Sequence, residues 1–148
     1  MQTLKRILGG VRRTSEKYGM ISDGDRIAVG ISGGKDSLAL LAALAEMRRF
    51  YPHRYEVVAV TVDMGFDPPA DFSRIREFCD GLGVEYHIVP TQIFDIVFRE
   101  RKEENPCSLC ARMRRGALYD AVKKIGCNKL ALGHHLDDAV NTFLMNLF

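Results

Sequence analysis

Long hydrophobic runs are missing from this sequence. No apolar stretch approaches the roughly 20 residues that a membrane-spanning helix needs, and the N-terminal residues contain no apolar signal-peptide core. Both absences predict a cytoplasmic protein without a membrane partner. We found no internal repeat and no low-complexity segment. With 47% hydrophobic and 27% charged residues, the 148-residue chain instead has the composition of one soluble, globular domain.

A strong net charge and a high cysteine content are also missing. The 21 basic and 19 acidic residues leave a net charge of only +2. The total therefore does not indicate nucleic-acid binding, which would need a local patch. Four cysteines in a chain of this kind indicate thiols or metal ligands rather than disulfides.

Alternating apolar segments predict an α/β fold. The predicted strands cover residues 26–31, 55–62, 84–89 and 129–132. The predicted helices cover residues 37–51 (stopped by Pro52), 71–82 (with Asp71 as its N-cap), 93–98 and 111–125. Such alternation is typical of a parallel sheet with helices on both faces. The last residues keep helical periodicity without a C-cap, so we expect a helix that runs to residue 148 in a chain that is cut or short at its C-terminus.

The first 22 residues predict a basic amphipathic helix, followed by a domain at residues 23–148. Apolar residues recur at helical spacing, and basic residues lie off that stripe. The helix either packs on the domain with a solvated basic face or touches RNA phosphates with that face.

A glycine-rich hexapeptide follows the first predicted strand and begins a helix. Its residues are Ser32, Gly33, Gly34, Lys35, Asp36 and Ser37. Adjacent glycines let the backbone approach a ligand closely, and the unpaired amides at a helix start attract an anion. Lys35 adds a positive charge for phosphate, and Asp36 can hold Mg²⁺ through oxygen. The spacing is neither a Walker A loop nor a GxGxxG motif, and an ordinary strand-to-helix turn is the alternative.

Polar residues also follow two other predicted strands. Val62 and Asp63 end the second strand, and Gly133 and His134 follow the fourth. Ligands bind at the carboxyl ends of strands in open α/β sheets. We therefore expect these four residues beside the ribose or base of a nucleotide.

A pair of acidic residues, Asp137 and Asp138, begins the last predicted helix. Adjacent residues on a helix point in different directions, so only one can face the cleft. We take Asp138 as the ligand of a phosphate-bound Mg²⁺. A zinc site that uses the preceding histidines and a solvated acidic helix start are the alternatives.

Two cysteines three positions apart, Cys107 and Cys110, lie at the start of a basic helix. A helix N-terminus and nearby arginines lower the pKa of a thiol and favour the thiolate. A redox dithiol, a zinc or iron–sulfur site and incidental cysteines all fit this spacing, although a metal site needs more ligands. We expect this pair to be reactive and the lone Cys79 and Cys127 to pack in the core.

Residues 99–124 form the most basic part of the chain. They contain eight basic and four acidic residues, a local excess of +4. Tyr119 is the only aromatic residue of the helix predicted there, so contacts with RNA phosphates are favoured over stacking on bases.

Together these motifs resemble the PP-loop ATP pyrophosphatases, in particular the tRNA thiolation enzymes of the 2-thiocytidine synthetase type. The resemblance rests on the hexapeptide at residues 32–37, on PCSLCARMRRG at 106–116, and on GHHLDD at 133–138 with NLF at 146–148. It spans nearly the whole chain. Lysidine synthetases share the first motif but not the cysteine pair.

The resemblance implies a Rossmann-like adenine nucleotide α-hydrolase fold, with residues 23–148 as the PP-loop ATP-binding domain. It implies that ATP with Mg²⁺ is cleaved between its α- and β-phosphates to adenylate a tRNA base carbonyl, with cytosine C2 as the expected atom. Sulfur then enters from a donor protein or from sulfide. Lys35, Asp36, Cys107 and Cys110 are the catalytic residues on this interpretation.

In that branch the paired cysteines bind a 4Fe–4S cluster, with a third cysteine from a later segment. Neither Cys79 nor Cys127 matches that third ligand, so Cys107 and Cys110 form an incomplete cluster site. A nucleotide-binding or redox-sensing module without thiolation activity is the alternative function. A homodimer is also left open.

Overall fold

The computed structural model describes residues 2–31, 35–66, 69–101, 106–133 and 142–146. Its centre is a five-stranded sheet with the strand order β3-β2-β1-β4-β5. The strands are β1 (Asp25–Gly30), β2 (Tyr55–Asp63), β3 (Glu85–Pro90), β4 (Lys129–Gly133) and β5 (Thr142–Asn146). The first four strands are mutually parallel, and β5 pairs antiparallel with β4.

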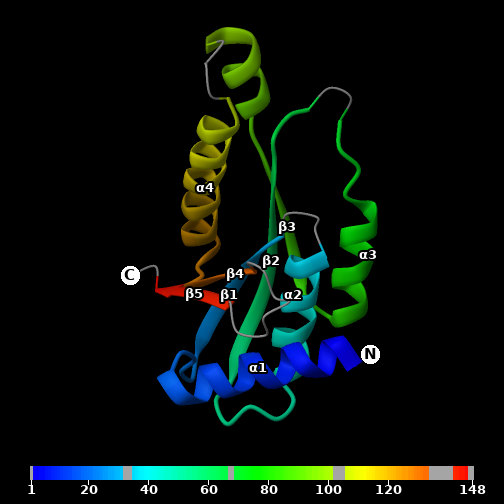
Figure 1. Ribbon diagram of the computed structural model, residues 1–148, viewed down its shortest axis with the longest axis vertical. Coiled ribbons are helices and arrows are strands. Elements are labelled where there is room, and N and C mark those ends of the chain that lie inside the picture. The colour runs from blue at the N-terminus through cyan, green and yellow to red at the C-terminus, as the bar shows by residue number, and fades with distance from the viewer. Residues whose placement is uncertain (1, 32–34, 67–68, 102–105, 134–141, 147–148) are drawn as a thin grey trace.

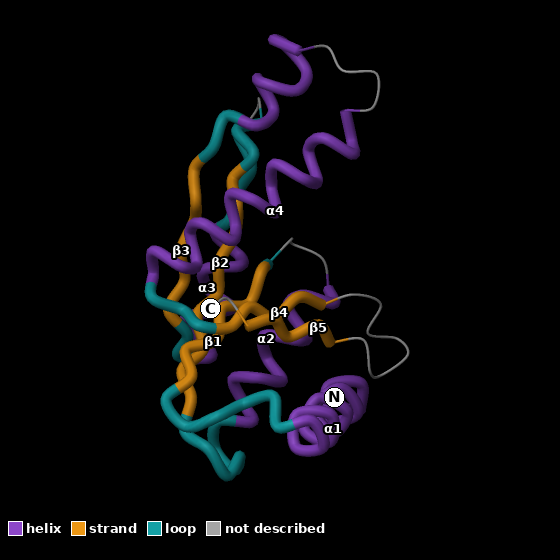
Figure 2. The backbone as a smooth tube through the Cα atoms, turned by 90° about the vertical axis from the view of Figure 1, so that its left-hand side faces the viewer, coloured by secondary structure: helices purple, strands orange, loops and turns teal. Residues whose placement is uncertain are grey.

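Helices cover both faces of this sheet, as predicted. They are α1 (Gln2–Tyr18), α2 (Lys35–Met47), α3 (Ser73–Leu82), the π-helix η1 (Asp95–Arg101) and α4 (Pro106–Ile125). Helices α2 and α3 lie on one side of the strands and α4 on the other, while α1 crosses near the amino ends of the strands (Figure 1). Figure 2 shows η1 beside the first turns of α4, and the two elements are in contact. No helix in the described ranges is long and apolar enough to cross a membrane.

The central strands are buried on both faces, which explains their continuous apolar sequence. Successive side chains of a strand point to opposite faces. In β2, Val57 and Ala59 therefore pack with α1, α2 and α3, whereas Val58 and Val60 pack with η1 and α4. Helix α1 belongs to the first of these two cores, because Val11 is buried within it. The boundary that we predict at residue 22 thus follows a helix that is packed on the domain.

A buried ion pair joins the amino ends of β1 and β4. Lys129 Nζ lies 2.7 Å from Asp25 Oδ2, and the two side chains are only 11% and 7% exposed. Asn128 Nδ2 donates to Asp25 Oδ1 over 2.8 Å, and the backbone N–H of Ser22 donates to Oδ2 over 2.8 Å. Burial alone would raise the pKa of Asp25, but these partners together lower it.

Several predicted boundaries moved by a few residues. Helix α2 ends at Met47 rather than near Pro52, because the N–H groups of Arg49 and Phe50 donate to carbonyls three residues back and continue the chain in tighter turns. The guanidinium of Arg48, just after the helix, donates to the carbonyls of Ala45 and Leu82. Asp71 is not the N-cap of α3, because its carboxylate accepts the N–H of Ser73 over 2.9 Å in a turn that precedes the helix. The predicted helix at 93–98 is present in π-helical form as η1. Helix α4 begins at Pro106, five residues earlier than predicted, because proline is well suited to a first helical position.

The predicted C-terminal helix is wrong over residues 142–146. This segment is β5, with Leu144 opposite Ala131 and Phe143 opposite Leu132. Without β5, strand β4 would be an edge with unpaired backbone groups. A short apolar run also fits a strand as well as a helix, so periodicity alone could not decide. The predicted helix start at Asp137 lies outside the described residues.

Candidate functional site

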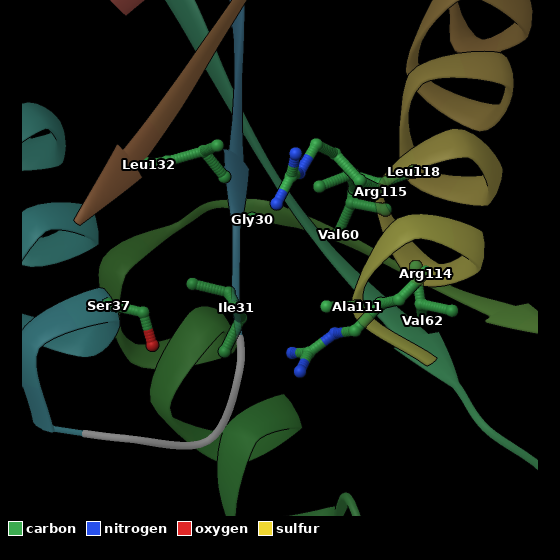
Figure 3. Close-up of a pocket in the computed structure, with 10 residues that line it drawn as sticks. All are labelled: Gly30, Ile31, Ser37, Val60, Val62, Ala111, Arg114, Arg115, Leu118 and Leu132. Carbon is green, nitrogen blue, oxygen red and sulfur yellow. The ribbon is translucent and has the colours of Figure 1, made fainter. Parts of the chain in front are cut away.

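A cavity of about 310 Å³ opens at the carboxyl ends of β1, β2 and β4, between α2 and α4 (Figure 3). Its lining residues are Gly30, Ile31, Ser37, Val60, Val62, Ala111, Arg114, Arg115, Leu118 and Leu132. The chain passes from β1 outward to β2 and β3, then returns to place β4 on the other side of β1. The cavity therefore lies at the topological switch point, where open α/β sheets bind ligands. Its volume is at the lower end of the range for small-molecule sites, about 300–1,000 Å³.

Glycine at position 30 keeps the floor of the cavity open. A Cβ atom on Gly30 would lie 2.8 Å from Leu132 Cδ2 and 3.1 Å from Leu118 Cδ2. Those two side chains reach the end of β1 from β4 and from α4 respectively. Only a residue without a side chain lets both approach this closely.

The residue that precedes the glycine-rich hexapeptide is held by β2, which β3 supports in turn. The N–H of Ile31 donates to the carbonyl of Val60 over 2.8 Å, and the hydroxyl of Thr61 donates to the carbonyl of Ile31 over 3.2 Å. Tyr86 on β3 donates its hydroxyl to Thr61 Oγ1 over 2.9 Å. Burial raises the pKa of Tyr86, which keeps this hydroxyl protonated as a donor. The chain therefore leaves β1 from a fixed point.

The first turn of α2 forms one wall of the cavity. Ser37 is buried and lines it, Asp36 is half-buried, and Lys35 is exposed. The first amides of a helix have no intrahelical partner and carry the positive end of the helix dipole. This wall is suited to an anionic ligand.

Helix α4 forms the opposite wall. Ala111, Arg114, Arg115 and Leu118 recur at the spacing that places side chains on one side of a helix. Both guanidinium groups extend from α4 toward the end of β1 (Figure 3). Among the described residues that line the cavity, none is acidic. The α4 wall therefore carries the positive charge of two arginines, and the α2 wall the positive end of the helix dipole.

The cysteine pair is on the same helix, directly before this wall. Cys110 is half-buried, packs against the core between α4 and the sheet, and precedes Ala111. Position 107 is in the first turn of α4, and its side chain lies outside the description. The structure thus brings Cys110 next to the cavity.

The other two cysteines are core residues, as predicted. Cys79 and Cys127 are both 0% exposed. Burial raises the pKa of Cys79 to about 11 and raises the pKa of Cys127 as well. Cys79 packs on the α3 side of the sheet, and Cys127 follows the far end of α4, about 22 Å along the helix from Cys110. Neither is placed to complete a cluster with Cys110, and the described residues contain no group of three or more side chains able to hold a metal ion.

Asp63 has a structural role at the end of β2. Its Oδ1 accepts the N–H of Gly65 over 3.0 Å, and its carbonyl accepts the N–H and the hydroxyl of Thr91 over 3.0 and 2.7 Å. Gly65 has φ of 76°, and a Cβ there would lie 2.6 Å from the carbonyl oxygen of Thr91. Asp63 therefore fixes a turn beside Val62, which does line the cavity.

The predicted site residues divide into two groups. The structure gathers Lys35, Asp36, Ser37, Val62, Asp63, Cys110 and Gly133 around one end of the sheet, and it describes Cys107 only by its backbone in the first turn of α4. The predicted Ser32, Gly33, Gly34, His134 and Asp138 lie outside the described residues.

Sequence reasoning missed the cavity roles of Gly30, Arg114 and Arg115. It assigned the arginines to thiol activation and RNA contacts. The helical spacing from Ala111 to Leu118 was the signal that could have shown a shared face of α4.

Comparison with known proteins agrees with this geometry. The chain is 48% identical, over 145 residues, to a tRNA-cytidine(32) 2-sulfurtransferase from Geobacter sulfurreducens. The aligned region covers 97% of this chain and 56% of that relative. The chain thus spans about half the length of the curated relatives it matches. It is similar in structure to the U34-tRNA thiolase NcsA from Methanococcus maripaludis, which was solved with its 4Fe–4S cluster. The TM-score is 0.71 at 29% identity, and the match covers 93% of this chain and 45% of the thiolase chain. An NAD⁺ synthetase from Burkholderia pseudomallei shares the fold at a TM-score of 0.57 and 16% identity, over 96% of this chain and 66% of its own.

The family assignment follows from a match over most of the sequence. The model of the PP-loop domain matches residues 9–148, a range that contains the hexapeptide, the cavity and the cysteine pair. This chain therefore belongs to the PP-loop domain family.

Proposed function

We propose that this chain is the ATP-binding part of a tRNA thiolation enzyme. It would adenylate a tRNA base carbonyl, with cytosine C2 as the expected atom, before sulfur replaces the oxygen. The observation that carries the proposal is the cavity at the switch point, which has the start of α2 on one side and the cysteine-bearing α4 on the other. Similarity to tRNA-cytidine(32) 2-sulfurtransferases and to a U34-tRNA thiolase supports it.

The position and the charge of the cavity support ATP as its ligand. The amides and Lys35 of the hexapeptide would bind the phosphates, and Asp36 with Asp138 would hold Mg²⁺ on them. The remaining proposed nucleotide contacts come from Ser32, Gly33, Gly34, Ser37, Val62, Asp63, Gly133 and His134. Mg²⁺ supplies positive charge that offsets the charge of the phosphates.

The chemistry comprises two substitutions. The base carbonyl oxygen attacks the α-phosphorus of ATP, and pyrophosphate leaves. A sulfur nucleophile then forms a bond to the same base carbon, and AMP leaves with the oxygen. Lys35 and Asp36 would orient the phosphates for the first step, and Cys107 with Cys110 would serve the second.

This chain supplies only two candidate cysteine ligands for a 4Fe–4S cluster among the described positions. Cys107 and Cys110 would offer two thiolates, and Cys79 and Cys127 are buried in the core away from Cys110. Such a cluster needs further ligands, so we assign no step to it. The sulfur donor, protein or sulfide, and a homodimer stay predictions. We also propose residues 1–22 as an N-terminal helix before the PP-loop domain and a cytoplasmic location.

The proposal is tested by measuring pyrophosphate release with and without tRNA, and by mass analysis of the nucleosides of that tRNA. We expect tRNA-dependent release and a thiolated cytidine, both lost in Lys35→Ala. Arg49→Ala is the matched control, because Arg49 is exposed beyond the opposite end of α2. ATP binding without tRNA-dependent turnover would refute the enzyme and favour the alternative of a nucleotide-binding or redox-sensing module.

A further inference from the structure

Helix α4 carries both the residues that line the cavity and the two cysteine positions. Its cavity-lining residues Ala111, Arg114 and Leu118 are spaced by three and four, and successive helical residues rotate by about 100°. Position 107 precedes Ala111 by four residues and therefore falls on the same stripe of the helix. Cys110 lies between these positions and packs toward the sheet. Anything bound in the cavity thus meets the helix that carries both cysteines.

The arginines are suited to an anionic group inside the cavity. Arg114 is half-buried and Arg115 is exposed, and the guanidiniums of both extend toward the end of β1 (Figure 3). Guanidinium binds phosphate with two parallel hydrogen bonds in a fixed geometry. Within the described ranges, neither arginine forms an ion pair with an acidic side chain.

We propose that Arg114 and Arg115 bind the phosphates of a nucleotide in the cavity, and that this contact fixes α4 so that nucleotide occupancy controls the reactivity of Cys110. The inference rests on the proposed nucleotide binding and adds a positioning role for the two arginines. Bound phosphates would then lie between the start of α2 and the side of α4, and would connect helices from opposite faces of the sheet. A thiol on a helix held against the sheet is less accessible to reagents than one on a helix that can move away.

The phosphate that the arginines bind could also belong to RNA, but the geometry favours a nucleotide. Arg112 and Arg115 are both exposed, but only Arg115 lines the cavity, so Arg112 is the residue better placed for an RNA backbone alone. Arg114 and Arg115 instead face a cavity with the size of a small-molecule site. Arg112 therefore provides a matched control on the same helix.

The test measures nucleotide affinity by calorimetry and the labelling rate of each cysteine by mass spectrometry, in the full chain. The probes are Mg²⁺ with a non-hydrolysable ATP analogue, and separately a short RNA. We expect Arg114→Gln and Arg115→Gln each to weaken analogue binding about tenfold, the value of a lost charged hydrogen bond. We expect the analogue to slow alkylation of Cys110 in the wild type and in Arg112→Gln, and this slowing to be lost in the other two variants. Circular dichroism melting verifies that all variants are folded.

The outcomes separate this inference from the proposed function. A wild type that binds no analogue would contradict the proposed ATP site itself. Unchanged analogue affinity in Arg114→Gln and Arg115→Gln, with a normal wild type, would overturn only the arginine contact. RNA binding lost while analogue binding persists would show that RNA is the source of the phosphate. Equal labelling of Cys110 with and without bound analogue would overturn the coupling.

Discussion

At the scale of single residues, the absence of a side chain at position 30 keeps the cavity open. In Gly30→Ala the new methyl group would press on Leu118 and Leu132, at 3.1 and 2.8 Å. We expect unfolding to become easier by about 1–3 kcal/mol through overpacking, with weaker nucleotide binding because the leucine ends must move into the cavity. Urea denaturation and calorimetry measure both effects.

Gly116→Ala is the control for this substitution. Gly116 lies within α4, and a Cβ there meets no atom within 4 Å. Alanine should therefore stabilise the helix by about 0.5–1 kcal/mol. Equal stability and equal nucleotide affinity in Gly30→Ala and the wild type would show that the leucines move at no cost.

The four cysteines should differ in reactivity. Burial raises the pKa of Cys79 to about 11 and raises that of Cys127, so both are protonated and shielded near neutral pH. Cys107 and Cys110 occupy the first turns of α4, where the helix dipole favours thiolate. We expect an alkylating reagent to modify Cys107 and Cys110 first, and all four cysteines to react in urea. Faster modification of Cys79 or Cys127 in the folded protein would contradict the assignment.

Asp25 should make stability depend on pH in the acid range. Its pKa in the folded protein lies below the ordinary value of 3.8, despite burial, because of Lys129, Ser22 and Asn128. A lowered folded pKa means that the stabilisation is present above pH 3.8 and is lost as pH falls through the folded pKa. We expect Asp25→Asn to cost up to about 3–5 kcal/mol near neutral pH, because it leaves Lys129 buried without its counter-ion. In urea denaturation the difference from the wild type should shrink as the pH falls below 3.8 and through the folded pKa. A constant difference would exclude Asp25 as its source.

At the scale of elements, local sequence signals predicted best where they are strongest. The long apolar runs of β1 and β2 and the end of α3 at Leu82, which the αL residue Gly83 follows, are found as expected. Helix ends were predicted less well, because small changes in backbone hydrogen bonding decide them: after Met47 the chain continues in tighter turns. Strand β5 could not be predicted, because its pairing with β4 is a property of the open edge and not of its own five residues.

Helix α1 offers an element-scale test of packing against the domain. Val11 is 3% exposed and lies in the core shared with α2, whereas Arg13, two residues later, is exposed. We expect Val11→Ala to destabilise the protein by about 1–3 kcal/mol through lost burial and a cavity. Arg13→Ala should change stability by no more than about 0.5 kcal/mol. Equal effects of the two substitutions in urea denaturation would mean that α1 is not held through its apolar face.

At the scale of the whole molecule, the candidate site depends on the sheet order more than on any motif. The sequence predicted a ligand site after the first and fourth strands from the hexapeptide and the strand ends. It could not show that α4 crosses the same point, since Arg114 lies about 80 residues after Lys35 in the chain and only the return of the chain to β4 brings them together. Long-range proximity of this kind leaves no periodic signal.

The same architecture predicts how a nucleotide affects global stability. ATP with Mg²⁺ in the cavity would contact α2 and α4, which lie on opposite faces of the sheet, so only the folded arrangement provides the site. Binding at 100 times the dissociation constant stabilises by about 2.7 kcal/mol, which for a domain of this size raises the melting temperature by about 5–10 °C. Lys35→Ala should lose most of this shift, because a phosphate contact at the start of α2 is gone, whereas Arg49→Ala, at the other end of α2, should keep it. Differential scanning fluorimetry with and without Mg–ATP measures this shift of the melting temperature. An equal shift in Lys35→Ala and the wild type would show that Lys35 of the hexapeptide does not contact the nucleotide.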